Sequence, residues 1–279
     1  MKKCVIVIPI YKQNPEISEL ASFKQCLSIL NKYDITIITY ESLSIDSYIN
    51  ESKNLNKSLK VEYFEKKYFK SVYGYNQLCL NKELYLRFCN YEYMLIYQLD
   101  AWAFEDRIDY WCSKEYDYLG APIFDSKGTF IGIGNGGFSL RKIKYCLKVL
   151  NRPAYLPYVT PIYLFDFYKY DFINRQHKSI KDVLLILFKI FLKSFGYKNN
   201  MKYYSNSKSF VNEDLLFSVM ARHAWGVNIN VPSLNESIDF AFERFPSELY
   251  IKNNLKLPFG CHAFEKWDFK EFWSKFIKY

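Results

Sequence analysis

Acidic residues at two places in this chain, a single Asp and an adjacent Glu-Asp pair, have a setting in which a carboxylate can do chemistry. Asp100 ends the apolar stretch YMLIYQL, where it can bind a hard divalent cation that bridges phosphates, or cap the segment that follows. Glu213 and Asp214 open the helix-like run EDLLFSVMARHAW. One of these two can act as a general base toward a hydroxyl group, or the pair can simply be stabilised by the helix dipole.

A glycine-rich loop and a late histidine are the other two candidates. The segment Gly132–Lys142 (GIGNGGFSLRK) has four glycines within six residues, which suits close approach to a ligand or a hairpin turn. Its GxGxxG spacing lacks the strand–turn–helix context of a dinucleotide-binding site. His262 lies in LPFGCHAFEKW, where an imidazole can complete a metal site or pack in the core.

Alternating strand and helix patterns in the first half predict a parallel sheet that positions some of these residues. We expect strands at 5–10, 34–40, 60–64 and 93–99, and helices at 16–30 and 75–88. Ligands of open α/β sheets bind at the carboxyl ends of the strands. The residues expected at that edge are Pro9, Tyr11 and Lys12 after the first strand, Glu41 after the second and Asp100 after the fourth.

The second half has shorter and more isolated patterns. Strands are expected at 116–120, 137–140 and 227–231, and a C-terminal helix is expected in DFKEFWSKFIKY. Because no repeat or linker interrupts the chain, we expect a single domain over 1–279. We expect a regular half over residues 1–125 and an elaborated half over residues 126–279.

The order of these features resembles that of GT-A glycosyltransferases. The similarity extends to an uncharacterised bacterial family of predicted glycosyltransferases, and it covers Val7 to Phe269 apart from residues 151–210. The blocks that carry it are VIPIYK, YFKSVYGYNQL, YMLIYQLDAWAF, YDYLGAPIF, GNGGFSLR, NED and PFGCHAFEKWDF.

The resemblance implies a GT-A-like (Rossmann-type) fold, with a mixed central sheet flanked by helices, and a nucleotide-diphosphate sugar donor, expected to be a UDP-sugar. It places Asp100 in the DXD element, Gly136 and Gly137 against the donor sugar, Glu213 and Asp214 beside the acceptor, and His262 in a site for Mn²⁺ or Mg²⁺. Asp214 is the expected base, with an inverting outcome. Asp100-Ala101-Trp102 has one carboxylate where a DXD element has two, so a metal-free enzyme that relies on Lys12 or Arg141 stays an alternative.

Positive charge is concentrated in residues 151–210. The chain carries 38 Lys and Arg against 29 Asp and Glu, and the segment holds ten basic residues and three Asp, which is +7 of the net +9. Within it, residues 178–195 (KSIKDVLLILFKIFLKSF) predict a largely apolar helix with a lysine stripe. Such a helix can lie on an anionic membrane or pack in a core or dimer interface. We expect a peripheral location on the inner face of the cell membrane, with a lipid-linked or other glycan acceptor of capsule or lipopolysaccharide synthesis.

Other features exclude some classes of protein. Seven scattered cysteines without a CxxC motif predict reduced thiols in a cytoplasmic protein, and no apolar run reaches the length of a membrane span. A sugar-nucleotide nucleotidylyltransferase is the first alternative, but PIYKQNPE after the first strand lacks the glycine of a phosphate loop. A non-catalytic membrane or RNA-binding module is the second. Since the basic cluster brackets an apolar helix, we expect no nucleic-acid partner.

Overall fold

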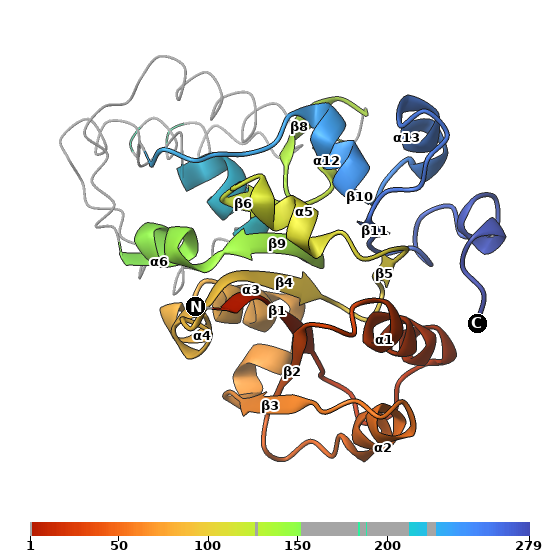
Figure 1. Cartoon of the computed structure of the whole chain (residues 1–279). Coiled ribbons are helices and arrows are strands. Elements are labelled where there is room, and N and C mark those ends of the chain that lie inside the picture. Colours follow the sequence, from red (N-terminus) through yellow and green to blue (C-terminus); the bar gives the residue numbers. More distant parts are fainter. Residues whose placement is uncertain (1, 126–127, 152–183, 185–187, 189–211, 222–226) are drawn as a thin grey trace.

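A six-stranded mixed sheet forms the centre of the molecule. The computed structural model describes residues 2–125, 128–151, 184, 188, 212–221 and 227–279 (Figure 1). The strand order is β3-β2-β1-β4-β9-β6. The first four strands of this order run parallel, whereas β9 runs antiparallel to both of its neighbours. The bounds are β1 Lys2–Pro9, β2 Asp34–Thr39, β3 Lys60–Tyr63, β4 Tyr91–Tyr97, β6 Tyr118–Leu119 and β9 Phe138–Lys142.

The expected α/β class, with a mixed sheet flanked by helices, is confirmed. Strand β1 is buried from Cys4 to Pro9, because helices cover both faces of the sheet. Its side chains alternate, so Val5 and Val7 join one apolar cluster while Cys4, Ile6 and Ile8 join the other.

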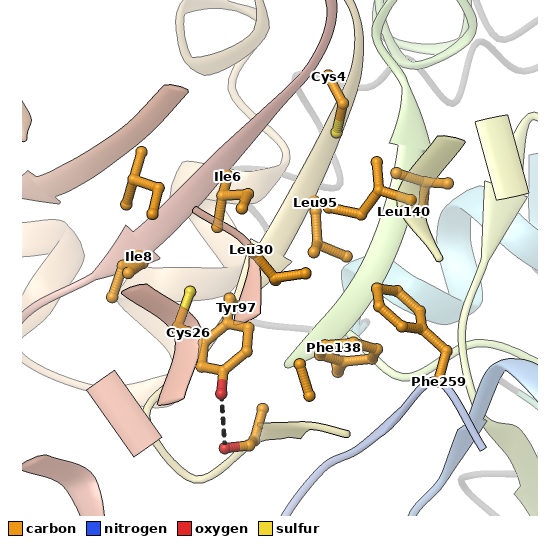
Figure 2. Packing of buried hydrophobic residues seen from close by; sticks show 14 of the residues in the cluster. Cys4, Ile6, Ile8, Cys26, Leu30, Leu95, Tyr97, Phe138, Leu140 and Phe259 are labelled. Carbon is orange, nitrogen blue, oxygen red and sulfur yellow. Dashed lines mark hydrogen bonds between the residues drawn. The ribbon is translucent and has the colours of Figure 1, made fainter. Parts of the chain in front are cut away.

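One face of the sheet packs against α1, α2 and α5. Figure 2 shows Ile6 and Ile8 of β1 and Leu95 of β4 beside Cys26 and Leu30, which come from α1 and its end. The bounds of these helices are α1 Ile17–Ile29, α2 Asp46–Asn54 and α5 Ile108–Ser113. Glu16 and Glu19 begin α1 with a capping box, which satisfies free backbone N–H groups of its first turn.

The opposite face packs against helices from the middle of the chain. These are η1 Lys66–Phe69, α3 Val72–Cys79, α4 Lys82–Arg87, α6 Ile143–Asn151, α10 Glu213–Leu215 and the π-helical segment η3 Leu216–Met220. The prediction of one helix over 75–88 is wrong. Helix α3 ends at Cys79 and α4 begins at Lys82. The Asn81 side chain accepts a hydrogen bond from Glu83 N and so caps α4 as a new helix.

A second, three-stranded sheet lies beyond the carboxyl end of β4 (Figure 1). Its order is β10-β11-β5, with β10 parallel and β5 antiparallel to β11. The bounds are β5 Trp102–Ala103, β10 Ala241–Phe242 and β11 Gly260–Cys261. A separate hairpin and two helices complete the region: β7 Pro122–Phe124, β8 Phe130–Ile133, α12 Leu234–Phe240 and α13 Pro246–Lys252.

Two further predictions of secondary structure are wrong. Residues 227–231 form no strand; instead Asp117 N donates to the Asn230 carbonyl, and Asn230 N donates to the Asp117 side chain, beside β6. The C-terminal segment forms turns and the short 3₁₀ helix η4 Trp273–Lys275 instead of an α-helix. Asp268 lies in the left-handed region at φ 54°, which ends helical geometry there, and the aromatic side chains pack into the core at Phe272 and Trp273.

The predicted helix at 178–195 lies outside the described residues except for Leu184 and Phe188. Across the part of the chain that the structure describes, no helix has both the length and the apolar character that a membrane crossing requires.

Candidate active site

Asp100 lies just beyond the carboxyl end of β4. After Tyr97 the chain turns sharply, and Ala101 N donates to the Gln98 carbonyl at 3.0 Å before β5 begins. The backbone carbonyl of Asp100 accepts a hydrogen bond from Phe264 N at 3.3 Å, so the C-terminal segment is held against this turn. The side chain of Asp100 is 46% exposed, which leaves it accessible to a ligand.

His262 reaches Asp100 because of the short second sheet. Strand β11 pairs with β5 so that Cys261 lies opposite Trp102, and the next residue therefore comes beside the turn at Asp100. His262 Nε2 lies 3.1 Å from Asp100 Oδ1 and 3.2 Å from the amide oxygen of Gln98. The structure thus brings together the two residues that the resemblance to GT-A glycosyltransferases assigned to one metal site.

Glu243 faces the other nitrogen of the same ring. Its Oε1 lies 3.6 Å from His262 Nδ1, which is close enough for an ion pair and too long for a hydrogen bond. Burial alone disfavours a charged imidazole, but Asp100 and Glu243 together raise the pKa of His262 to about 10. Burial likewise disfavours the charged form of Asp100, but the charge and hydrogen bond of His262 hold its pKa below the ordinary value. At neutral pH the ring is therefore positively charged.

The glycine loop connects this cluster to the second pair of acids. A side chain at Gly137 would place its Cβ 1.9 Å from His262 Nε2, and one at Gly136 would place its Cβ 2.2 Å from Glu213 Oε1. Asn135 has φ 81°, and its side chain accepts a hydrogen bond from Gly137 N at 3.0 Å. The loop joins β8 to β9, which pair with different strands, so the hairpin-turn alternative is wrong.

Glu213 is buried in an ion pair with Arg141 of β9. The Arg141 NH2 group lies 2.9 Å from Glu213 Oε1, and the two side chains are 0% and 6% exposed. The remaining guanidinium donors bind Ser139 Oγ, the Tyr85 hydroxyl and the Gly136 carbonyl. On the backbone side, Glu213 N donates to the side chain of Asn76 at 2.9 Å. Glu213 therefore fixes the start of α10, and its carboxylate is already engaged.

Asp214 is the acid of this pair that remains available. Its side chain is partly buried, and Oδ1 accepts a hydrogen bond from Leu215 N at 2.6 Å. Burial and the neighbouring charge of Glu213 raise the pKa of Asp214 to about 7, and Glu243 adds to the same effect. A carboxyl group with a pKa near the working pH suits general-base catalysis, because it is deprotonated often enough and still basic enough to take a proton.

The other strand-end residues are placed differently from one another. Pro9 is buried at the end of β1, and Tyr11 is 57% exposed and close enough to Asp100 for its charge to contribute to a raised tyrosine pKa. Glu41 is exposed after β2, and no described contact links it to the cluster. Lys12 binds Glu16 at 2.9 Å and Glu19 at 2.8 Å, so its charge is already matched.

Reasoning from the sequence missed Gln98, Glu243 and Asn76. Gln98 had a usable signal, since it precedes Asp100 by two residues and the two flank Leu99 at a strand end. Glu243 had a weaker one, as a single acid within the apolar stretch FAFERF. Asn76 had none, because its role depends on a contact with a residue 137 positions away.

Two comparisons of the sequence bear on this site. A family model described as "Protein of unknown function (DUF5672)" matches residues 58–262. The chain belongs to this family. The match includes Asp100, Asp214, Glu243 and His262, whereas the end of β1 lies outside it. No curated protein matches the sequence.

Solved structures are similar to parts of the chain. Core-mannan synthase A from Aspergillus fumigatus, in its Mn/GDP form, is 11% identical with a TM-score of 0.41 and matches over 54% of this chain and 63% of that one. Residues 1–349 of TarS from S. aureus, in complex with UDP-GlcNAc, are 13% identical with a TM-score of 0.33, over 51% of this chain and 46% of that one. This chain thus spans less than two thirds of either structure. Likeness of this extent says nothing about what the chain binds or does.

Proposed function

We propose that this protein is a glycosyltransferase that moves a sugar from a nucleotide-diphosphate donor, with a UDP-sugar as the expected one, to a hydroxyl group of a glycan or lipid-linked acceptor. One observation carries the proposal. Adjacent glycines contact His262, which forms a carboxylate–imidazole pair suited to a cation, and Glu213, whose neighbour Asp214 has a carboxyl group with a pKa of about 7. Sugar transfer from a diphosphate needs both, since charge on the leaving group must be neutralised and the acceptor must lose a proton.

The Asp100 end of the site fits a divalent cation. Its donors are a carboxylate oxygen, an imidazole nitrogen and the amide oxygen of Gln98, a mixture of ligands that Mn²⁺ accepts. Asp100 Oδ1 and His262 Nε2 lie 3.1 Å apart, so both would be within reach of one cation. Within the described residues no group of three or more His, Cys, Asp or Glu side chains could hold a metal ion, so the donor diphosphate would supply the remaining ligands.

The alternative without a metal finds less support. Lys12 is bound by two glutamates and Arg141 is buried against Glu213, so neither cation is available to a leaving diphosphate. A bound Mn²⁺ or Mg²⁺ would supply that charge by polarising the phosphate oxygens. His262 must then lose the proton on Nε2 to act as a ligand, which a cation at this position favours.

Asp214 is the proposed base. It takes the proton from the acceptor hydroxyl as the acceptor oxygen bonds to the anomeric carbon, while the bond from that carbon to the phosphate oxygen breaks and the nucleoside diphosphate leaves. One displacement of this kind inverts the anomeric centre. Glu213 supports the reaction indirectly, since its pair with Arg141 holds the helix start on which Asp214 lies.

The remaining expectations are parts of this proposal. Residues 1–125 would form the nucleotide-binding half and residues 126–279 the acceptor half of one catalytic domain. Residues 178–195, supported by the +7 charge of residues 151–210, would dock on an anionic membrane, at the inner face of a bacterial cell, in the synthesis of a surface polysaccharide. Co-sedimentation with anionic vesicles at low and high salt tests this docking. No sedimentation with such vesicles at low salt would contradict it.

The test of function is donor turnover. UDP-, GDP- and CMP-sugars are incubated with the protein and Mn²⁺, and release of the nucleotide is measured with and without glycan acceptors. We expect one UDP-sugar to be turned over, Asp100→Ala to abolish this turnover, and the control Asp109→Ala, on the exposed side of α5, to keep it. Formation of a nucleotide sugar from a nucleoside triphosphate and a sugar phosphate would favour a nucleotidylyltransferase instead. No turnover of any donor would contradict the proposal.

A further inference from the structure

Glu243 lies beside Nδ1 of His262, the ring nitrogen that does not contact Asp100, and the proposed reaction gives its carboxylate no role. Resting on the proposed function, we infer that Glu243 is a positioning residue: it binds Nδ1 of His262 and thereby directs Nε2 to the place where the cation and the donor diphosphate bind.

The contacts of the ring are divided between its two nitrogens. Nε2 has Asp100 Oδ1 at 3.1 Å and Gln98 Oε1 at 3.2 Å. Nδ1 is buried and has no hydrogen-bond partner among the described residues, although Glu243 Oε1 lies only 3.6 Å away. A shift of the Glu243 side chain by about half an ångström would bring this distance into the range of an N–H···O hydrogen bond.

The backbone places Glu243 beside His262 by strand pairing. In the parallel pair of β10 and β11, Phe242 lies opposite Cys261, so the residues that follow them leave the sheet together. His262 N also donates to the Phe242 carbonyl at 3.0 Å, which ties the two segments at this point. No other partner is recorded for the Glu243 carboxylate within the described part of the chain, and its side chain is 21% exposed.

Backbone pairing alone leaves the orientation of the ring undecided. Rotation of the imidazole by 180° exchanges its nitrogen and carbon positions, and it would turn a carbon toward Asp100. Glu243 opposes this rotation, because it would then face a ring carbon instead of the Nδ1 hydrogen. Once the ring is neutral, a carboxylate at Nδ1 also keeps the remaining proton on that nitrogen, so the lone pair of Nε2 is the one offered to a cation.

Glu243 is not proposed as a ligand of the cation itself. Nδ1 and Nε2 lie on different sides of the ring, and the described acidic, histidine and cysteine residues include no group of three that could hold a metal. An outer carboxylate of this kind typically changes metal affinity by about 10–100-fold.

The experiment measures Mn²⁺ binding by electron paramagnetic resonance in the presence of UDP. We expect Glu243→Ala to weaken Mn²⁺ binding about 10–100-fold. Glu243→Gln should keep most of the affinity, because its amide oxygen can still accept from Nδ1–H. Glu248→Gln, an exposed glutamate in the first turn of α13, is the matched control and should bind as the wild type does. If Glu243→Ala fails to fold, Glu243→Leu takes its place.

A spectroscopic measurement separates positioning from general stability. In the protein with Mg²⁺ and UDP, the Nδ1 proton of His262 should give a hydrogen-bonded resonance that Glu243→Gln keeps and Glu243→Ala or Glu243→Leu loses. The chain has only three histidines, so the resonance of His262 can be assigned with few variants. Normal Mn²⁺ binding by Glu243→Ala, with binding lost in Asp100→Ala, would overturn this inference and leave the proposed function standing. Wild-type protein that binds no Mn²⁺ with UDP would overturn the cation site and the inference together.

Discussion

Two acid–base clusters lie on either side of the glycine loop, and they differ in how completely their polar atoms are satisfied. In the cluster next to Gly136, each nitrogen of the Arg141 guanidinium has a partner, and the ion pair of Arg141 with Glu213 is buried. In the cluster next to Gly137, His262 Nδ1 has no hydrogen bond among the described residues, and the Asp100 side chain is nearly half exposed. The pair of Arg141 with Glu213 is therefore satisfied within the fold, whereas the cluster at His262 keeps polar atoms that the proposed ligand could bind.

The largest effect on folding is expected from breaking the closed pair. Arg141→Met should lower the free energy of unfolding by about 3–5 kcal/mol, because it leaves the Glu213 carboxylate buried without a partner. Denaturant unfolding followed by circular dichroism measures the loss. The exposed pair of Lys32 with Asp109 is the contrast, and Lys32→Met should cost no more than about 1 kcal/mol. Equal costs for the two substitutions would remove the distinction drawn here.

Asp214→Asn should slow turnover and should not weaken folding. Removal of a positioned base slows a reaction by about 10²–10⁴-fold, so transfer should collapse while Mn²⁺ and UDP still bind. Steady-state rates and nucleotide titrations test the two halves of this expectation, with Asp109→Asn as an exposed control. If Glu213→Gln loses turnover and Asp214→Asn keeps it, the proposed roles of the two acids are reversed.

The two adjacent glycines allow a matched test. Alanine at Gly136 would press on Glu213, and alanine at Gly137 would press on His262. Overpacking typically costs about 1–3 kcal/mol, and the closed pair has no free space in which to relax. We therefore expect Gly136→Ala to lower the melting temperature more, and Gly137→Ala to weaken Mn²⁺ binding more. If one of the two variants shows both the larger loss of melting temperature and the larger loss of Mn²⁺ affinity, the expected difference between the two clusters is wrong.

The smallest effect is a dependence of stability on pH at Asp214. Its pKa of about 7 in the folded protein lies above the value of about 3.9 expected for an unfolded chain. The folded state therefore favours the protonated acid, and this contribution to stability is complete below pH 4 and lost as pH rises through 7. Asp214→Asn stays neutral at every pH. It should melt higher than the wild type at pH 8, by about 2–4 °C for each kcal/mol of difference, and this difference should disappear near pH 4. A constant difference across this range would show that Asp214 does not titrate as described.

Much of the central sheet could be predicted from the sequence, because its strands are continuous apolar runs. β1, β2, β3 and β4 all agree with the expected strands to within three residues. The break between α3 and α4 was missed because helical spacing continues across Leu80 and Asn81, and the capping side chain alone separates the helices.

The candidate site was predicted in part. The order of Asp100, the glycine loop, Asp214 and His262 pointed to one site through its resemblance to glycosyltransferases. The part played by Glu243 could not be predicted in this way. Its contact with His262 depends on β10, β11 and β5, which are two residues long each and too short to leave a periodic pattern. The apolar pattern at 227–231 misled for the opposite reason, since a few β-branched residues suggest a strand where the chain only bonds to Asp117 beside the edge strand β6.

The pairing of β11 with β5 also bears on the order of events during synthesis. Trp102 can pair with Cys261 only after the ribosome has added about 160 further residues. At about 5–20 residues per second, that interval is roughly 10–30 s. The four parallel strands can assemble in this time, whereas the cluster around His262 can form only once nearly all of the chain has been made. A nascent chain stalled before residue 260 would thus hold the four parallel strands and yet lack the histidine on which the proposed cation site depends.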